Sequence, residues 1–202
     1  MLLASWLNEA QKREWQQRHQ LDFALSLPGC PRLRASAFTH SQGISLVLRL
    51  LPMTCPTLAA LHTPVALAEL LREESGLILV TGATGSGKST TLAAMVDHLN
   101  HQLAGHIMTL EDPVEFVHES DSCLIHQREV GAHTASFSLA LRAALRQDPD
   151  VILLGELRDS DTIRLALTAA ETGHLVLATL HTRGAAQAIE RLVDVFPAQE
   201  KE

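Results

Sequence analysis

From about residue 67 onward, short apolar runs alternate with amphipathic stretches. The apolar runs, which we expect to be β-strands, are GLILVTG at 76–82, HIMTL at 106–110, VILLG at 151–155 and LVLATL at 175–180. The amphipathic stretches predict helices over 88–103, 136–147, 160–172 and 184–195. Apolar strands that alternate with helices are typical of a parallel sheet covered on both faces. The pattern therefore predicts an α/β domain over residues 67–202.

The first fifty or so residues follow a different pattern. Leu3, Trp6, Leu7 and Ala10 recur at helical spacing, which predicts one amphipathic helix over 2–19. Three short strands are expected within LDFALSLPG, RLRASAF and ISLVLRLLP, because each run is apolar or alternating and is bounded by Gly, Pro or Ser. Together they predict a small α+β unit over residues 1–52. The stretch PMTCPTLAALHTP contains three prolines, which favours a linker over residues 53–66.

Composition narrows the class of function. The 202 residues carry 16 Lys and Arg against 23 Asp and Glu, a net charge of −7, and no basic run, which argues against nucleic acid as the main partner. The three cysteines show no CxxC spacing, so we expect reduced thiols in a cytoplasmic protein. The opening MLLASWLNEAQKREW has neither a basic leader nor a long apolar stretch, so we expect no signal peptide and no direct membrane insertion.

The motif between the first strand and its helix indicates the chemistry. GATGSGKS matches GxxxxGK[ST] in the strand-to-helix context that a phosphate-binding P-loop requires. Such a loop surrounds phosphate oxygens with backbone N–H groups, while Lys88 reaches the outer phosphates and the Ser89 hydroxyl holds Mg²⁺. The sequence therefore predicts a site for ATP and Mg²⁺ made of Gly82, Ala83, Thr84, Gly85, Ser86, Gly87, Lys88, Ser89 and Thr90.

Acidic residues and a histidine follow the other strands. LEDPVE places Glu111, Asp112 and Glu115 after the second strand, and like charges this close need a positive partner or water. Glu156 follows VILLG, and His181 follows LVLATL. Ligands bind at the carboxyl ends of parallel strands, so we expect these groups to meet the P-loop at one edge. A magnesium ion carried with the nucleotide then supplies the positive charge.

DPDVILLGE resembles a Walker B segment, and we assign Glu156 to Mg²⁺, directly or through water. The alternative is a surface acid that caps the next helix. A shared metal site for His174 and His181 is excluded, because seven residues of strand span on the order of 23 Å. His181 lies at the nucleotide edge, whereas His174 lies at the opposite edge, in packing, an interface or a structural hydrogen bond.

Four segments resemble the type II/IV secretion and pilus ATPase family. They are LVTGATGSGKSTTLAAMVDHLN, the Asp box IMTLEDPVEFVHES, the atypical Walker B ALRQDPDVILLGELRDSDTIRLALTAAETGH and the His box TLHT. EFVHES, HQREVG and the ending VDVFP are similar to the branch that retracts type IV pili, rather than to assembly or secretion ATPases. The resemblance implies part of a PAS-like domain at 1–52 and a RecA-like P-loop NTPase domain at 67–202, in a chain that starts inside the first and stops before the family's C-terminal helical region.

The resemblance also implies roles and partners. Glu115 polarises the attacking water, Lys88 binds phosphate, Glu156 holds the metal and His181 lies at the nucleotide edge. Arg32, Arg34 and Arg49 are candidates for neutralising the γ-phosphate, or else ordinary surface arginines. The family implies a cytoplasmic homo-oligomer, a hexameric ring peripheral to the inner membrane, which contacts a membrane platform protein and uses ATP hydrolysis for twitching motility.

Three residues, at two places in the chain, depart from the family pattern. Ala83 replaces the usual proline in the P-loop, and Arg183 and Gly184 follow the His box where small polar residues are usual. Two other functions stay open: a pilus assembly or type II secretion ATPase of the same superfamily, and a regulatory subunit that binds nucleotide without hydrolysing it. A RecA-like DNA-handling protein is disfavoured by the lack of basic residues.

Overall fold

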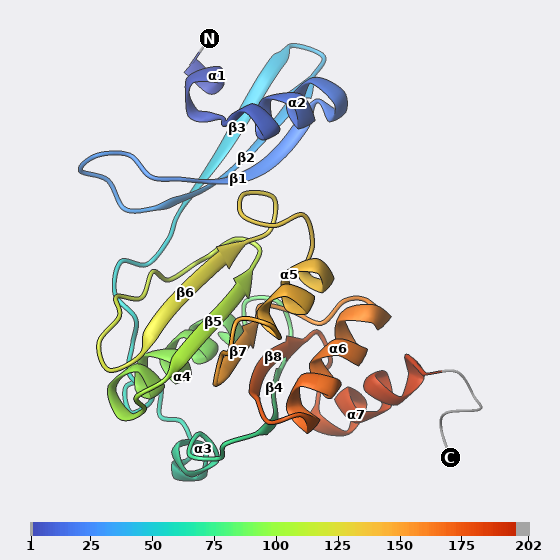
Figure 1. Ribbon diagram of the computed structural model, residues 1–202. Helices are drawn as coiled ribbons and strands as arrows, with labels where there is room; N and C mark the ends of the chain where they lie inside the picture. Colours follow the sequence, from blue (N-terminus) through green and yellow to red (C-terminus); the bar gives the residue numbers. More distant parts are fainter. Residues whose placement is uncertain (1, 197–202) are drawn as a thin grey trace.

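The computed structural model describes residues 2–196 and contains two sheets (Figure 1). The N-terminal part contains helices α1 (Leu2–Trp6) and α2 (Glu9–Arg18) and strands β1 (Gln20–Leu25), β2 (Leu33–His40) and β3 (Gly43–Leu50). The three strands form an antiparallel sheet in the order β1-β2-β3. The last residues of the predicted α/β domain, 197–202, lie outside the described part of the chain.

The predicted single helix over 2–19 is wrong, because the helix is interrupted at Leu7 and Asn8. Asn8 Oδ1 accepts a hydrogen bond from the Gln11 backbone N–H at 2.9 Å, and Gln11 Oε1 accepts one from the Asn8 N–H at 3.0 Å. This reciprocal capping box starts a new helix, α2. Leu3 and Leu7 are buried against the sheet, whereas α2 has no buried residue.

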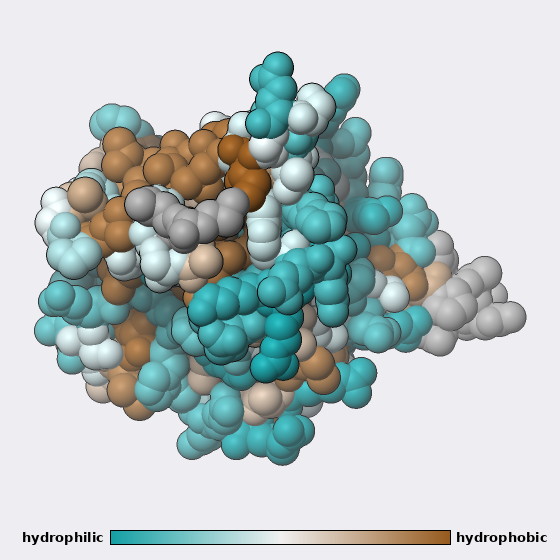
Figure 2. Space-filling model, turned by 90° about the horizontal axis from the view of Figure 1, so that it is seen from above, coloured by the Kyte–Doolittle hydropathy of each residue, from teal (hydrophilic) through white to brown (hydrophobic). Residues whose placement is uncertain are grey.

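One face of the N-terminal sheet is packed and the other faces the second sheet. Every second residue at the start of β2 is buried on the face that carries the helices: Leu33, Ala35 and Ala37. The intervening Arg34 therefore lies on the opposite face. The edge strand β3 is poorly covered: Val47, Leu48 and Leu50 are among its exposed residues. Figure 2, which looks onto the molecule from above, shows apolar surface exposed beside hydrophilic surface.

The larger part is a five-stranded parallel sheet in the order β4-β8-β7-β5-β6. Its strands are β4 (Gly76–Thr81), β5 (His106–Glu111), β6 (Leu124–Glu129), β7 (Val151–Leu154) and β8 (Leu175–Leu180). Its helices are α3 (Val65–Leu70), α4 (Lys88–Gln102), α5 (Phe137–Ala144), α6 (Ser160–Glu171) and α7 (Ala185–Asp194). The predicted α/β fold, with a small antiparallel sheet before it, is confirmed.

The alternation of side chains along each strand separates two cores. Ile152 and Leu154 point toward α5, α6 and α7, whereas Val151 and Leu153 point toward α4. The apolar stripe predicted on α4 is buried there through Leu92, Met95, Val96 and Leu99. Helices therefore cover both faces of the sheet, which leaves its strand ends available for a site (Figure 1).

Two elements had no counterpart in the sequence pattern. Strand β6, LIHQRE, is largely polar and lies at an edge of the sheet, where it pairs only with β5. Helix α3 begins inside the segment 53–66, where Leu58 is also buried in the core beside α4. That segment therefore packs against the sheet as well as joining the two parts of the chain.

Candidate nucleotide site

The P-loop joins β4 to α4, and its backbone shows why glycine is needed. Gly82 has φ +152°, and a Cβ on it would lie 2.5 Å from Ser86 Oγ. Gly87 adopts a left-handed conformation and is the N-cap of α4. The tight turn therefore depends on residues without a side chain.

Lys88 is a buried charge, 8% exposed, held inside this loop. Its ammonium Nζ donates hydrogen bonds of 2.9 Å to the Gly82 and Ala83 carbonyl oxygens. Ser89 and Thr90 occupy the first turn of α4, where backbone N–H groups have no partner inside the helix. The loop thus combines a cation with unpaired donors, the pattern that binds anions.

A cavity of about 500 Å³ opens beside the loop, at the carboxyl ends of the parallel strands. It brings together residues that are remote in the sequence. The predicted residues that line it are Arg34, Arg49, Thr84, Gly85, Gly87, Lys88, Ser89, Thr90, Glu115, Glu156 and His181. Gly82, Ala83 and Ser86 belong to the same loop but do not line the cavity. Both sheets contribute, because Arg34 lies on β2 and is paired in register with Arg49 on β3.

Glu156 is 9% exposed and has two side-chain neighbours. Arg158 Nε forms an ion pair with its Oε1, and His181 Nε2 lies 3.3 Å from its Oε2. Arg158 is itself 69% exposed. The helix-capping alternative for Glu156 is not what the structure has, because Asp159 is the N-cap of α6 and its side chain accepts from the Thr162 N–H.

The LEDPVE segment crosses one wall of the cavity. Val114 and Phe116 are buried and anchor it on either side of Glu115. Glu111 Oε1 accepts hydrogen bonds from Thr109 Oγ1 at 2.6 Å and Gln127 Nε2 at 3.3 Å. Burial raises the pKa of Glu111, and these two donors only partly oppose it.

Asp112 is an exposed residue in the same segment. Partial burial raises the pKa of Asp112, and the nearby guanidinium groups of Arg158 and Arg34 act in the lowering direction. The positive charges around the acidic cluster thus include arginines from both parts of the chain. The sequence pattern did not single out Arg158, Gln127 or Thr109, since their role depends on which strands are neighbours.

Arg32 and His174 lie elsewhere. Arg32 does not line the cavity; its Nη2 donates to Glu129 Oε2 at 2.6 Å. His174 follows α6 at the opposite edge, where its backbone N–H and its Nδ1 lie 3.1 and 3.0 Å from the Ala169 carbonyl oxygen. This contact fits the structural alternative for His174.

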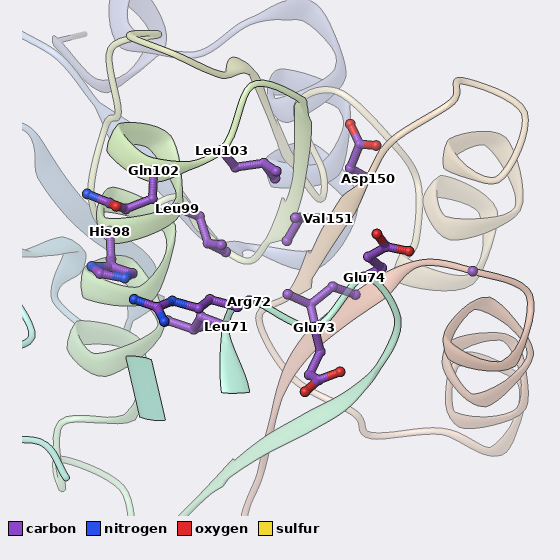
Figure 3. A pocket seen from close by; sticks show the side chains of 12 residues that line it. Leu71, Arg72, Glu73, Glu74, His98, Leu99, Gln102, Leu103, Asp150 and Val151 are labelled. Carbon is purple, nitrogen blue, oxygen red and sulfur yellow. The ribbon is translucent and has the colours of Figure 1, made fainter. Parts of the chain in front are cut away.

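A second cavity, about 480 Å³, lies at the amino ends of the strands (Figure 3). Val151 and Leu175, the first residues of β7 and β8, are part of its lining. Figure 3 shows Arg72 close to His98 on one side, with Glu74 and Asp150 on the other. None of the predicted site residues lines this cavity.

Comparison with known proteins agrees with this arrangement. The sequence profile described as Type II/IV secretion system protein matches residues 10–200. The chain belongs to the type II/IV secretion system protein family. The resemblance inferred from the four motifs is thereby confirmed.

Relatives within the type II/IV secretion system protein family are similar along the whole chain but longer. The uncharacterized protein YggR of Escherichia coli K12 is 68% identical over 100% of this chain and 62% of its own length. The type IV pilus retraction ATPase PilT of Pseudomonas aeruginosa is 52% identical over 99% of this chain and 58% of its own. This chain therefore spans about three fifths of those relatives.

A solved structure of the same family extends the match to the fold. The crystal structure of the pilus retraction motor PilT with bound ADP superimposes with a TM-score of 0.95 at 46% identity. The match covers 99% of this chain and 58% of that one. The PilT structure thus shows the fold of this chain in a protein that binds an adenine nucleotide.

Proposed function

We propose that this chain is the nucleotide-binding part of a pilus retraction ATPase, which hydrolyses Mg²⁺-bound ATP to drive twitching motility. The observation that carries the proposal is the cavity of about 500 Å³ between the P-loop, a group of carboxylates that includes Glu115 and Glu156, and two arginines of a second sheet. The similarity to PilT over nearly the whole chain supports it.

Substrate phosphates are assigned to the P-loop. The ammonium of Lys88 and the first-turn N–H groups of α4 bind the β- and γ-phosphate oxygens, and Thr84 and Gly85 close the loop over them. Binding requires Lys88 to exchange its two carbonyl contacts for phosphate. The exchange is favourable because phosphate carries full negative charge, whereas the carbonyl groups are neutral dipoles.

The donors present also fit a magnesium ion. The cavity offers the Ser89 hydroxyl and the Glu156 carboxylate, and hard cations prefer oxygen ligands. Among residues 2–196, no three His, Cys, Asp or Glu side chains cluster as a metal site, so phosphate oxygens and water complete the ligand set. When bound, Mg²⁺ neutralises charge that develops on the phosphates.

The remaining lining residues supply the base and the countercharge. Glu115 accepts the proton of the attacking water, and Arg34 and Arg49 stabilise charge on the transferred phosphoryl group. His181, which lies beside Glu156, contacts the nucleotide at the same edge of the sheet. Arginines in such positions raise turnover by roughly 10³ to 10⁵. The proposed base, the two arginines and the histidine all line one cavity, which is the arrangement that polarising a water molecule requires.

Within a whole pilus machine, we assign the chain to a homo-hexameric ring at the cytoplasmic face of the inner membrane, where a platform protein receives its motion. No helix among residues 2–196 is both long and apolar enough to cross a bilayer. The proposal places the ring peripheral to the membrane and includes no nucleic-acid partner.

The test is steady-state phosphate release with Mg²⁺ and ATP. Lys88→Ala and Glu156→Gln should abolish release, whereas Glu190→Gln, the same change at an exposed site on α7, should leave it intact. Mass measurement with and without an ATP analogue tests ring formation. Wild-type chain that binds ATP without releasing phosphate would instead support the non-hydrolysing regulatory subunit.

A pilus assembly or type II secretion ATPase is the second candidate. The two candidates share the site chemistry, so biochemical assays of this chain do not separate them. Restoring twitching motility in a strain without its retraction ATPase, by a full-length protein containing this chain, would favour retraction. Restored pilus assembly would favour the alternative.

A further inference from the structure

The strongest unexplained contact joins the two sheets. Glu129, the last residue of β6, has a side chain only 7% exposed. Its Oε2 accepts a hydrogen bond from Arg32 Nη2 at 2.6 Å and another from the Val114 backbone N–H at 3.1 Å. One carboxylate oxygen therefore binds the N-terminal sheet and the LEDPVE segment at the same time.

The two donors lead directly to the two halves of the proposed site. Arg32 stands two residues before Arg34, so both side chains leave the same side of an extended chain. Val114 directly precedes Glu115. Glu129 thus bonds the side chain of a residue close to the proposed countercharge and the backbone N–H of the residue before the proposed base.

Neighbouring hydrogen bonds make this connection rigid. The Val130 N–H donates to the Glu111 carbonyl at 2.9 Å, which ties the end of β6 to the start of the acidic segment. On the other side, the Leu51 N–H donates to the Arg32 carbonyl at 2.8 Å, which extends the pairing between β2 and β3. The ion pair between Arg32 and Glu129 therefore connects two stretches of backbone that are each held by hydrogen bonds.

Energetics argue that the pair fixes geometry. Burying two charges costs desolvation energy that their attraction often only balances, so such a pair is weak evidence for stability. Removing one partner, however, leaves a buried charge without compensation. What the pair provides is a defined distance between the groups that it joins.

We propose that Arg32 and Glu129 are positioning residues that hold the arginines of the N-terminal sheet in place opposite Glu115. The inference rests on the proposed function, since it assigns these residues a part in ATP turnover. Neither lines the large cavity, so they act through Arg34, Arg49 and Glu115. Turnover should therefore depend on them, whereas nucleotide affinity, set by the P-loop, should not.

The experiment compares Arg32→Gln, Glu129→Gln and the double variant with Arg18→Gln. Arg18 forms an exposed ion pair with Glu14 in the same part of the chain, so its loss is a matched control. Turnover of ATP, affinity for a fluorescent ATP analogue and hydrogen exchange of the peptide covering 112–117 are measured for each. Arg32→Lys, which keeps the charge, serves as a second variant should Arg32→Gln fail to fold.

Arg32→Gln should lower turnover about tenfold or more, keep affinity within about twofold and speed exchange over 112–117. The double variant should lose no more than the worse single variant, because one contact is broken in all three. Arg18→Gln should change none of these. Unchanged exchange in Arg32→Gln, or faster exchange with full turnover, would overturn the inference. Wild type that releases no phosphate would overturn the proposed function instead, while exchange still reports whether Arg32 holds the segment.

Discussion

Replacing Gly82 by alanine tests the P-loop geometry most directly. The residue has φ +152°, a backbone conformation that costs a residue with a side chain about 1–3 kcal/mol. The new Cβ would also lie 2.5 Å from Ser86 Oγ and 3.3 Å from Ser86 Cβ, an overlap that adds about 1–3 kcal/mol unless the Ser86 side chain rotates or the loop moves. Movement of the loop displaces the groups that bind phosphate.

The expected result is a loss of nucleotide affinity. Even the smallest sum, about 2 kcal/mol, corresponds to roughly thirtyfold in the dissociation constant. Gly85→Ala is the matched control: φ there is +79°, and no atom lies within 4 Å of its Cβ. It should lose only the share due to backbone strain, about 1–2 kcal/mol or roughly five- to thirtyfold.

Ser86→Ala in the Gly82→Ala background separates the two causes. The substitution removes Oγ, the atom in closest overlap, so it should restore the part of the affinity that the overlap cost. Titration with a fluorescent ADP analogue measures all four proteins. Gly82→Ala with wild-type affinity, or no recovery in the double variant, would refute the argument that the missing side chain shapes this loop.

Three further predictions concern the rest of the molecule. Burial raises the pKa of Glu111, so the folded state binds its proton more tightly than the unfolded state; stability from this group is greatest at low pH and is lost as pH rises through the folded pKa. Wild type should therefore lose stability relative to Glu111→Gln between pH 5 and pH 8 in urea unfolding, and a constant difference would contradict this. Leu154→Ala, at a fully buried position of β7, should lower the free energy of unfolding by about 2–5 kcal/mol in the same assay. The control is Leu139→Ala at an exposed position, where a loss above about 0.5 kcal/mol would show that burial is not the cause. Burial and then Asp97 raise the pKa of Cys55 to about 11, so an alkylating reagent at pH 8 should modify the exposed Cys30 first by mass spectrometry; equal rates would contradict the assigned environment.

The sequence predicted the apolar strands of the parallel sheet well. The runs that became β4, β5, β7 and β8 are apolar because helices cover both sheet faces, and such runs are visible without coordinates. Strand β6 was missed because its sequence, LIHQRE, is largely polar, whereas the other edge strand, β4, is apolar and was predicted. The helix break at Asn8 was missed because its capping box lies inside a stretch with helical spacing.

The candidate site divides in the same way. The predicted P-loop is local in sequence, so the spacing of Gly82, Gly87 and Lys88 was enough to indicate it, and the structure has a strand, a loop and a helix there. The expectation of a parallel sheet was also enough to place Glu156 and His181 at the edge where the strands end, beside the predicted P-loop. The pairing of Arg32 with Glu129 had no sequence signal, because the two residues are 97 positions apart, one directly before β2 and the other at the end of β6.

By itself, the sequence determined the fold class and the family and indicated the proposed phosphate-binding loop, because those depend on periodic burial and on residues adjacent in the chain. Only the tertiary structure decided which arginines face the cavity and which one is held by a buried carboxylate. Strand alternation sends Arg34 toward the cavity, but the partner that each arginine meets depends on how two sheets pack together. That packing is set by side chains from many distant positions at once, so no local pattern reports it.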